Sequence, residues 1–216
     1  MEAATSGRTN RGLYAGLAAG TAGAVVLATV GLLLDDHLPL VDVWALDVLR
    51  TTQGEPAYTV VTAVSDGLGA VCVGGAAAAI AWLVWQAPRH AWRLALGYVL
   101  LFLLLAGSAE LLKAVFARPH PVGMADWSFP SAHVAIVATA TLITVGILGR
   151  LITRWRRHLV MLAVIVVAVI AVTRVWLGEH HVTDVVATAA GYAGLGYAGL
   201  RLLDTWLVAR SVDRAP

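Results

Sequence analysis

Cysteine and charged side chains are scarce in this chain of 216 residues, and each scarcity excludes a class of protein. The single cysteine, Cys72, can form neither an intramolecular disulfide nor a cluster of thiolate ligands for a metal. Charged residues make up 13% of the sequence and apolar residues 59%, whereas a soluble domain has about 25% charged residues. With a mean hydropathy of +0.79, the sequence predicts a polytopic membrane protein without a soluble domain.

The apolar residues are gathered in six runs, each close to the roughly 20 residues that a helix needs to cross a bilayer. The runs cover residues 12–34, 59–85, 94–116, 131–149, 159–176 and 185–207. The arginines are scattered among the connectors, and no long basic run indicates a nucleic-acid partner. We therefore expect a single all-α domain over residues 1–216, built as a bundle of six transmembrane helices.

The basic residues are distributed unevenly among the connectors between these runs. Most of the 15 lysines and arginines lie before the first run, after the second and fourth runs, and in the C-terminal tail. The positive-inside rule then places both termini in the cytoplasm. The connectors after the first, third and fifth runs are expected on the outer side of the membrane.

Two further segments carry expectations about packing. Residues 35–58 mix aspartates with apolar residues, which predicts a short amphipathic helix lying on the membrane surface. In the last run, Gly191-Tyr-Ala-Gly-Leu is followed directly by Gly196-Tyr-Ala-Gly-Leu. A period of five is too short for a structural repeat, so we interpret this pattern as a surface of small residues for close helix packing.

The stretch from Thr173 to Asp184 places ionisable side chains between two apolar runs. Ionisable residues at membrane depth or at its edge are candidates for function, because burying them is costly. His180 and Asp184 are spaced i, i+4, so a helix would bring the carboxylate to the same face as the imidazole. The alternative is a polar turn between two transmembrane helices with incidental histidines.

A second polar connector, after the third run, is also expected on the outer side. Its cations run against the positive-inside bias and indicate an anion, because lysine and arginine both recognise phosphate. The free backbone N–H groups at the start of the fourth run form a second feature of an anion site. The residues concerned are Lys113, the only lysine in the chain, with Arg118, His120, Ser131, Ala132 and His133.

Each of these residues also has an ordinary structural interpretation. Lys113 could extend toward the interface or pair with Glu110, and Arg118 could pair with Asp126. Ser131 could be a helix cap, and His133 could make a hydrogen bond between helices. The case for a site therefore depends on the residues occurring together.

Together, the motifs resemble the three-part signature of the type 2 phosphatidic acid phosphatase superfamily, whose members share their site with vanadium haloperoxidases. The signature has a lysine, six residues and Arg-Pro, then Pro-Ser-Gly-His, then Ser-Arg, five residues, His, three residues and Asp. The corresponding segments here are Lys113 to His120-Pro121, Pro130-Ser131-Ala132-His133, and Thr173-Arg174 with His180 and Asp184. The order and the spacing agree, and the resemblance implies the same six-helix fold.

The sequence departs from the family pattern at three positions. Ala132 replaces a glycine whose backbone N–H is the group used, and Thr173 replaces a serine while keeping the hydroxyl. His120 stands where the first motif has its arginine, and Arg118 stands two residues earlier. Either Arg118 or His120 could take the role of the first-motif arginine, and a histidine there predicts a more acidic rate optimum.

The resemblance implies a metal-independent reaction with no cofactor. His180 would be the nucleophile that forms a phosphohistidine, Asp184 would orient it, and His133 would be the general acid. The phosphate would be held by Lys113, Ser131, Ala132, Arg174 and either Arg118 or His120. The partners implied are a lipid phosphate substrate and membrane lipids, and the oligomeric state is left open.

The family likeness favours hydrolysis of a polyprenyl diphosphate at the outer face of a bacterial plasma membrane. Phosphatidic acid and phosphatidylglycerol phosphate are alternative substrates. A protein that binds or transports phospholipids without hydrolysis is a different class, for which the spacing of His180 and Asp184 would be unnecessary. A haloperoxidase is a third class, and the six apolar runs argue against it.

Overall fold

The computed structural model describes residues 2–34, 38–86, 88–122 and 126–212, and these residues form helices joined by short connectors. The helices are α1 (Glu2–Leu33), α2 (Leu40–Leu49), α3 (Pro56–Gln86), α4 (Pro88–Phe116), α5 (Ala132–Leu151), α6 (Arg156–Trp176) and α7 (Val182–Val212). A 3₁₀ turn, Thr153–Trp155, precedes α6. No strand occurs in the described ranges, so the all-α prediction is confirmed.

The six long helices correspond to the six apolar runs of the sequence. Five of them, all except α7, are long and apolar enough to cross a membrane among the residues that the structure describes. The glycines and tyrosines of α7 lower its mean apolarity, because they replace aliphatic side chains along much of its length. Five candidate spans are thus confirmed, and six crossings with both termini in the cytoplasm stay a prediction.

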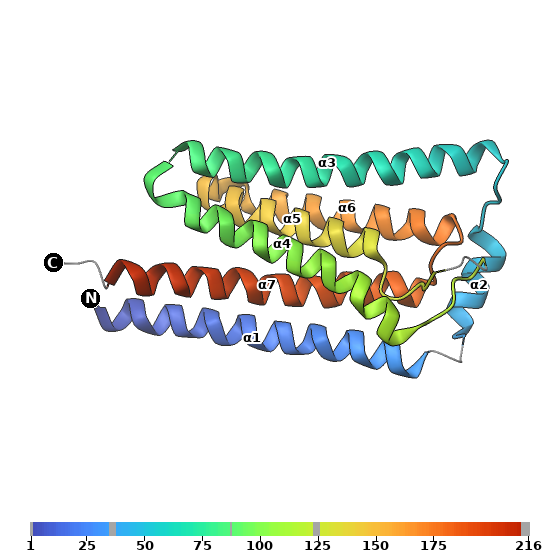
Figure 1. The fold of residues 1–216 in the computed structure, drawn as a ribbon, viewed down its shortest axis with the longest axis horizontal. Helices are drawn as coiled ribbons and strands as arrows, with labels where there is room; N and C mark the ends of the chain where they lie inside the picture. The colour runs from blue at the N-terminus through green and yellow to red at the C-terminus, as the bar shows by residue number, and fades with distance from the viewer. Residues whose placement is uncertain (1, 35–37, 87, 123–125, 213–216) are drawn as a thin grey trace.

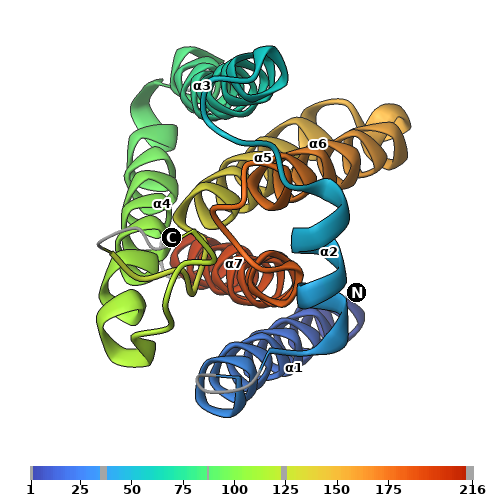
Figure 2. The same ribbon diagram turned by 90° about the vertical axis from the view of Figure 1, so that its right-hand side faces the viewer.

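α5 forms the centre of the bundle and packs against α3, α4, α6 and α7 (Figures 1 and 2). More than half of its most apolar window is buried, against 28% or less in the other candidate spans. Its buried residues, such as Val137, Ile143 and Ile147, form the core with side chains from the surrounding helices. Leucines such as Leu104 and Leu111 of α4 point outward, as expected for helices surrounded by hydrocarbon.

α1 and α7 lie side by side along most of their length (Figure 1). A Cβ atom added to Gly23 would stand 2.6 Å from the carbonyl oxygen of Gly191, so the two backbones approach more closely than larger residues allow. Gly194 likewise faces the backbone of Ala19. The Gly-Tyr-Ala-Gly-Leu pattern is therefore a packing surface, as the sequence predicted.

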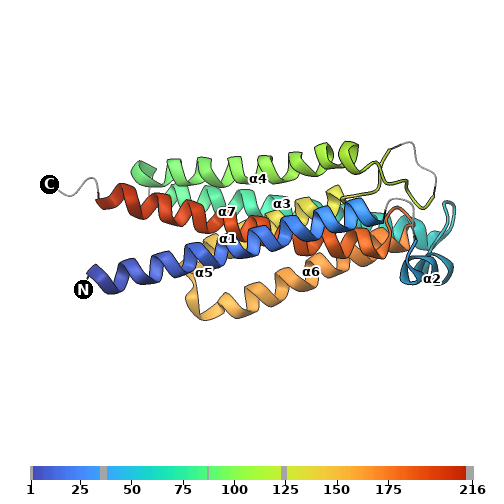
Figure 3. The same cartoon turned by 90° about the horizontal axis from the view of Figure 1, so that it is seen from below.

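The short helix α2 lies at one end of the bundle and crosses the direction of the long helices (Figures 2 and 3). Its apolar residues Leu40, Trp44 and Val48 point outward, while Asp42 and Ala45 are buried against the bundle. The connectors between α4 and α5 and between α6 and α7 lie at the same end (Figure 1). A short helix thus exists where the sequence predicted one, and its buried face contains a carboxylate.

Candidate active site

The predicted site residues come from four segments that meet at the α2 end of the bundle (Figure 1). α4 ends with Lys113 in its last turn, and the following connector leads to Ser131 at the start of α5. Arg174 lies in the last turn of α6, and Asp184 in the first turn of α7. Helix ends therefore hold the charged groups, while the histidines lie in or beside the connectors.

His180 is the most enclosed histidine of the predicted set, with 3% of its surface exposed. Its Nδ1 lies 4.0 Å from Oδ2 of Asp184, which is an ion-pair distance rather than a hydrogen bond. Burial lowers the pKa of His180 well below its ordinary value, and the charges of Arg174, His120 and Lys113 act in the same direction. The ring is therefore neutral at neutral pH and keeps a lone pair for reaction.

His120 lies directly beside His180, with 5.2 Å between the ring centroids. Its Nδ1 donates a hydrogen bond to the backbone carbonyl of Glu179, and its Nε2 is 3.3 Å from Oδ1 of Asp126. Burial lowers the pKa of His120 and outweighs the opposing effect of the Asp126 carboxylate. His120 thus faces the nucleophile candidate and gains its charge only in acidic solution.

Arg118 occupies a different environment from the one expected of a phosphate ligand. Its guanidinium donates hydrogen bonds to Asp184, to the Thr183 hydroxyl at 2.9 Å and to Asp42 at 3.1 Å, and only 1% of the residue is exposed. The pairing with Asp126 that the sequence suggested is absent among the described residues. Because two carboxylates already neutralise Arg118, its geometry does not support the predicted contact with phosphate.

The start of α5 corrects one detail of the predicted anion site. The backbone N–H of Ser131 donates to the hydroxyl of Thr188 at 3.0 Å, so it is not free for a phosphate oxygen. The Ser131 hydroxyl, in contrast, is buried without a hydrogen-bond partner in the described chain. Ser131 therefore offers its side chain, and the backbone contribution falls to Ala132 and His133.

The two remaining cations are paired with nearby carboxylates. Lys113 lies 3.5 Å from Glu110, as the i, i+3 spacing suggested, and 3.7 Å from Asp126. Both carboxylates are mostly exposed, and such pairs contribute little energy. Arg174 forms an ion pair with Glu179. An incoming phosphate has to compete with these carboxylates.

Asp66 is a site residue that the sequence reasoning missed. It lies on α3, and its Oδ1 is 3.6 Å from Nε2 of His133. The only available signal was the dipeptide Ser65-Asp66, which interrupts an otherwise apolar run. The two side chains can form an ion pair when His133, the expected proton donor, is protonated.

No group of three or more histidine, cysteine or acidic residues in the described ranges could hold a metal ion. The side chains that meet here are cations and histidines with single carboxylates between them. Such an arrangement can bind a tetrahedral oxyanion, present a neutral imidazole to it, and supply a proton from a second imidazole.

Comparisons with known proteins agree with this geometry. The sequence model of the PAP2 superfamily matches residues 92–206. The fold is similar to the crystal structure of the first transmembrane PAP2 type phosphatidylglycerolphosphate phosphatase from Bacillus subtilis, with a TM-score of 0.65. The two sequences are 18% identical, and the match covers 94% of this chain and 100% of that chain. No curated protein matches. The family resemblance drawn from the motifs is confirmed.

Proposed function

Because the chain belongs to the PAP2 superfamily, we propose that it hydrolyses the phosphate ester or diphosphate of a lipid, without a metal ion. The observation that carries the proposal is the buried, neutral ring of His180. Lys113 and Arg174 lie close enough for their positive charges to lower the pKa of this ring. A neutral imidazole is a nucleophile, and nearby cations stabilise charge on the equatorial oxygens of a transferring phosphoryl group.

In the first step, Nε2 of His180 attacks phosphorus, and a P–N bond forms while the bond from phosphorus to the lipid oxygen breaks. His133 donates its proton to that leaving oxygen, so the lipid departs with a hydroxyl or as a monophosphate. The product on the enzyme is a phosphohistidine. Asp184, 4.0 Å from the ring, stabilises the positive charge that the ring acquires.

In the second step, a water molecule attacks the phosphorus of the phosphohistidine. His133, now neutral, accepts a proton from the water, and the P–N bond breaks with its electron pair returning to His180. Inorganic phosphate leaves, and both histidines regain their starting protonation states. One pair of histidines thus serves both half-reactions.

The phosphate oxygens are held by Lys113, Arg174, His120 and the Ser131 hydroxyl. The buried and unpartnered Ser131 hydroxyl supports its part in this set. The ion pair of Arg174 with Glu179 opens when phosphate takes the place of the carboxylate.

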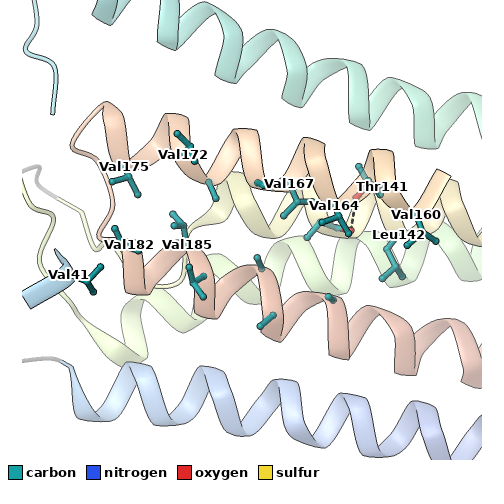
Figure 4. A pocket seen from close by; sticks show the side chains of 18 of the residues that line it. Val41, Thr141, Leu142, Val160, Val164, Val167, Val172, Val175, Val182 and Val185 are labelled. Atoms are coloured by element: carbon teal, nitrogen blue, oxygen red, sulfur yellow. Dashed lines mark hydrogen bonds between the residues drawn. The ribbon is translucent and has the colours of Figure 1, made fainter. Parts of the chain in front are cut away.

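The substrate is a lipid, and its hydrocarbon tail lies in an apolar groove between α5, α6 and α7 (Figure 4). The groove has a volume of about 840 Å³ and is lined almost entirely by valine, alanine and leucine. Val175 and Val185 belong to this lining and directly follow Arg174 and Asp184 in the sequence. This continuity supports a molecule with a phosphate at one end and hydrocarbon at the other.

Among lipid phosphates, a polyprenyl diphosphate is the first candidate, and the site faces the extracytoplasmic side of a bacterial plasma membrane. The Bacillus subtilis protein of the same fold is a phosphatidylglycerolphosphate phosphatase, which makes that lipid the second candidate. Phosphatidic acid is the third. The positive-inside distribution of basic residues supports the orientation.

The test is phosphate release by the purified, detergent-solubilised protein from these three lipids, each with and without a chelator. We expect turnover of at least one lipid, unchanged by the chelator and abolished in His180→Ala. Binding of the lipids without release would instead support a binding or transport protein. Bromination that depends on vanadate would support a haloperoxidase.

A further inference from the structure

Asp42 on α2 is fully buried, and every interaction of its carboxylate is with a segment distant in sequence. Oδ1 accepts a hydrogen bond from the backbone N–H of Thr183 at 2.9 Å. Oδ2 accepts from the Thr183 hydroxyl at 2.6 Å and from Arg118 at 3.1 Å. A buried carboxylate is tolerated only when donors compensate for its lost hydration, and these three donors do so.

The position of Asp42 opposes the pattern of its own helix. The outward face of α2 is mostly apolar, and the inward face holds the Asp42 carboxylate against the first turn of α7. The N–H groups in the first turn of a helix have no partner within that helix, and negative charge is favoured there. Asp42 therefore supplies to α7 the acceptor that a capping residue of α7 itself would normally supply.

From Asp42, an unbroken series of contacts leads to the nucleophile. Arg118 bridges the carboxylates of Asp42 and Asp184. The second oxygen of Asp184 accepts from the backbone N–H of His181 at 3.1 Å and lies 4.0 Å from Nδ1 of His180. With one guanidinium between two carboxylates, the series has a formal charge of −1. Without Asp42, the full charge of Arg118 would be directed at Asp184.

We propose that Asp42 is a positioning residue for His180, acting through Arg118 and Asp184. This role rests on the proposed phosphatase function. Asp42 holds one nitrogen of the Arg118 guanidinium while Asp184 holds the other, so the two carboxylates share the positive charge of Arg118. Asp184 therefore keeps its orientation, and it keeps enough negative charge to stabilise the imidazolium of the phosphohistidine. α2 is thus part of the site, although Asp42 itself does not touch the reacting phosphate.

The first test compares Asp42→Asn with Asp47→Asn, an exposed aspartate on the same helix. Asparagine retains one carbonyl oxygen for Thr183 but loses the charge shared with Arg118. We expect kcat of Asp42→Asn to fall about tenfold to a hundredfold, by analogy with the outer carboxylates that orient metal-binding histidines, with KM within twofold of the wild type. Asp47→Asn should match the wild type. A wild-type kcat in Asp42→Asn, or a loss confined to KM, would overturn the role.

A double-mutant cycle then separates positioning from general loss of structure. If Asp42 acts through Arg118, the losses in Asp42→Asn and Arg118→Met should be strongly non-additive, so that the double variant is no slower than the slower single variant. Additive losses would contradict the proposal. Thr183→Val removes only the hydroxyl that bonds to Asp42 and Arg118. This variant can therefore test the proposal if Asp42→Asn does not fold. It should lower kcat with KM unchanged, and a wild-type kcat would count against the proposal.

The same measurements distinguish a wrong role for Asp42 from a wrong phosphatase function. If the wild-type protein released no phosphate from any of the three lipids, the phosphatase proposal and the role of Asp42 would both be wrong. If the wild type is active and Asp42→Asn is equally active, only the role of Asp42 is wrong.

Discussion

The imidazole rings of His120 and His180 face each other at a centroid distance of 5.2 Å, with 55° between their planes. A proton on one ring disfavours a proton on the other at this distance. The two rings have opposite requirements in the proposed reaction. His180 must be neutral to attack phosphorus, whereas His120 must be charged to attract phosphate.

The first prediction concerns the pH dependence that follows from this pair. Burial lowers the pKa of both rings, and that of His180 is the more strongly lowered. As the pH falls from neutral, His120 therefore gains its charge while His180 is still neutral, and kcat/KM should rise. In His120→Arg the charge is present at every pH, so we expect the optimum to move to higher pH and the rise in kcat/KM on the acid side to become smaller.

The measurement is kcat/KM as a function of pH, which reports ionisations of the free enzyme. His158→Arg, an exposed histidine at the start of α6, is the matched control and should keep the wild-type profile. An identical optimum in His120→Arg and the wild type would show that His120 does not govern phosphate binding.

The second prediction tests His133 as the general acid. His133→Ala should lose about 10²- to 10⁴-fold in kcat on a lipid phosphate, whose alkoxide leaves poorly without a proton. Nitrophenolate leaves without protonation, so the burst of nitrophenol from p-nitrophenyl phosphate should keep a rate near that of the wild type. His180→Ala should give no burst. Equal losses on both substrates in His133→Ala would assign this histidine to binding instead.

The sequence predicted the helices and the third motif because both depend on local patterns. A run of about 20 apolar residues must be helical in a bilayer, where backbone groups have no other hydrogen-bond partners. The i, i+4 spacing of His180 and Asp184 brings them near each other in any helical conformation, although His180 itself lies just before α7. The cations between the third and fourth apolar runs were likewise evident from their place in the sequence.

The partner of Arg118 depended on tertiary structure and was missed. Asp126 is close in sequence, but the guanidinium is bonded to Asp42 and Asp184, which become neighbours only when α2 docks on α7. The Ser131 N–H was expected to be free for the same reason, since Thr188 on α7 was not foreseen as its acceptor. Asp66 belongs to no motif, and only the fold brings its carboxylate within 3.6 Å of His133.

The third prediction concerns Asp66. Its carboxylate stabilises the protonated ring of His133, so Asp66→Asn should slow the protonation of the leaving group. Because the pair is largely exposed, we expect a loss of only about twofold to fivefold in kcat on lipid phosphates. The nitrophenol burst should be unaffected, and Asp47→Asn serves as the exposed control on α2. A loss on the aryl substrate as large as on the lipid would exclude this role.

The fourth prediction tests the apolar groove of Figure 4 as the place of the lipid tail. Ala193 lines the groove nine residues beyond Asp184, about 13 Å along the helix at a rise of 1.5 Å per residue. Phenylalanine at this position narrows the groove without reaching the charged site. Ala193→Phe should therefore lower kcat/KM severalfold for a long-chain lipid phosphate and leave a dihexanoyl analogue unaffected, because six carbons extend only about 8 Å.

The control is Ala78→Phe, which places the same side chain on the exposed surface of α3, outside the groove. It should leave both chain lengths unaffected. Equal losses for the long and short substrates in Ala193→Phe would indicate a distortion that reaches the site. An unchanged kcat/KM for the long-chain lipid would place the tail elsewhere. A tail in the groove must pass residue 193, and there the phenylalanine ring would take up space and remove part of the apolar contact area of the tail.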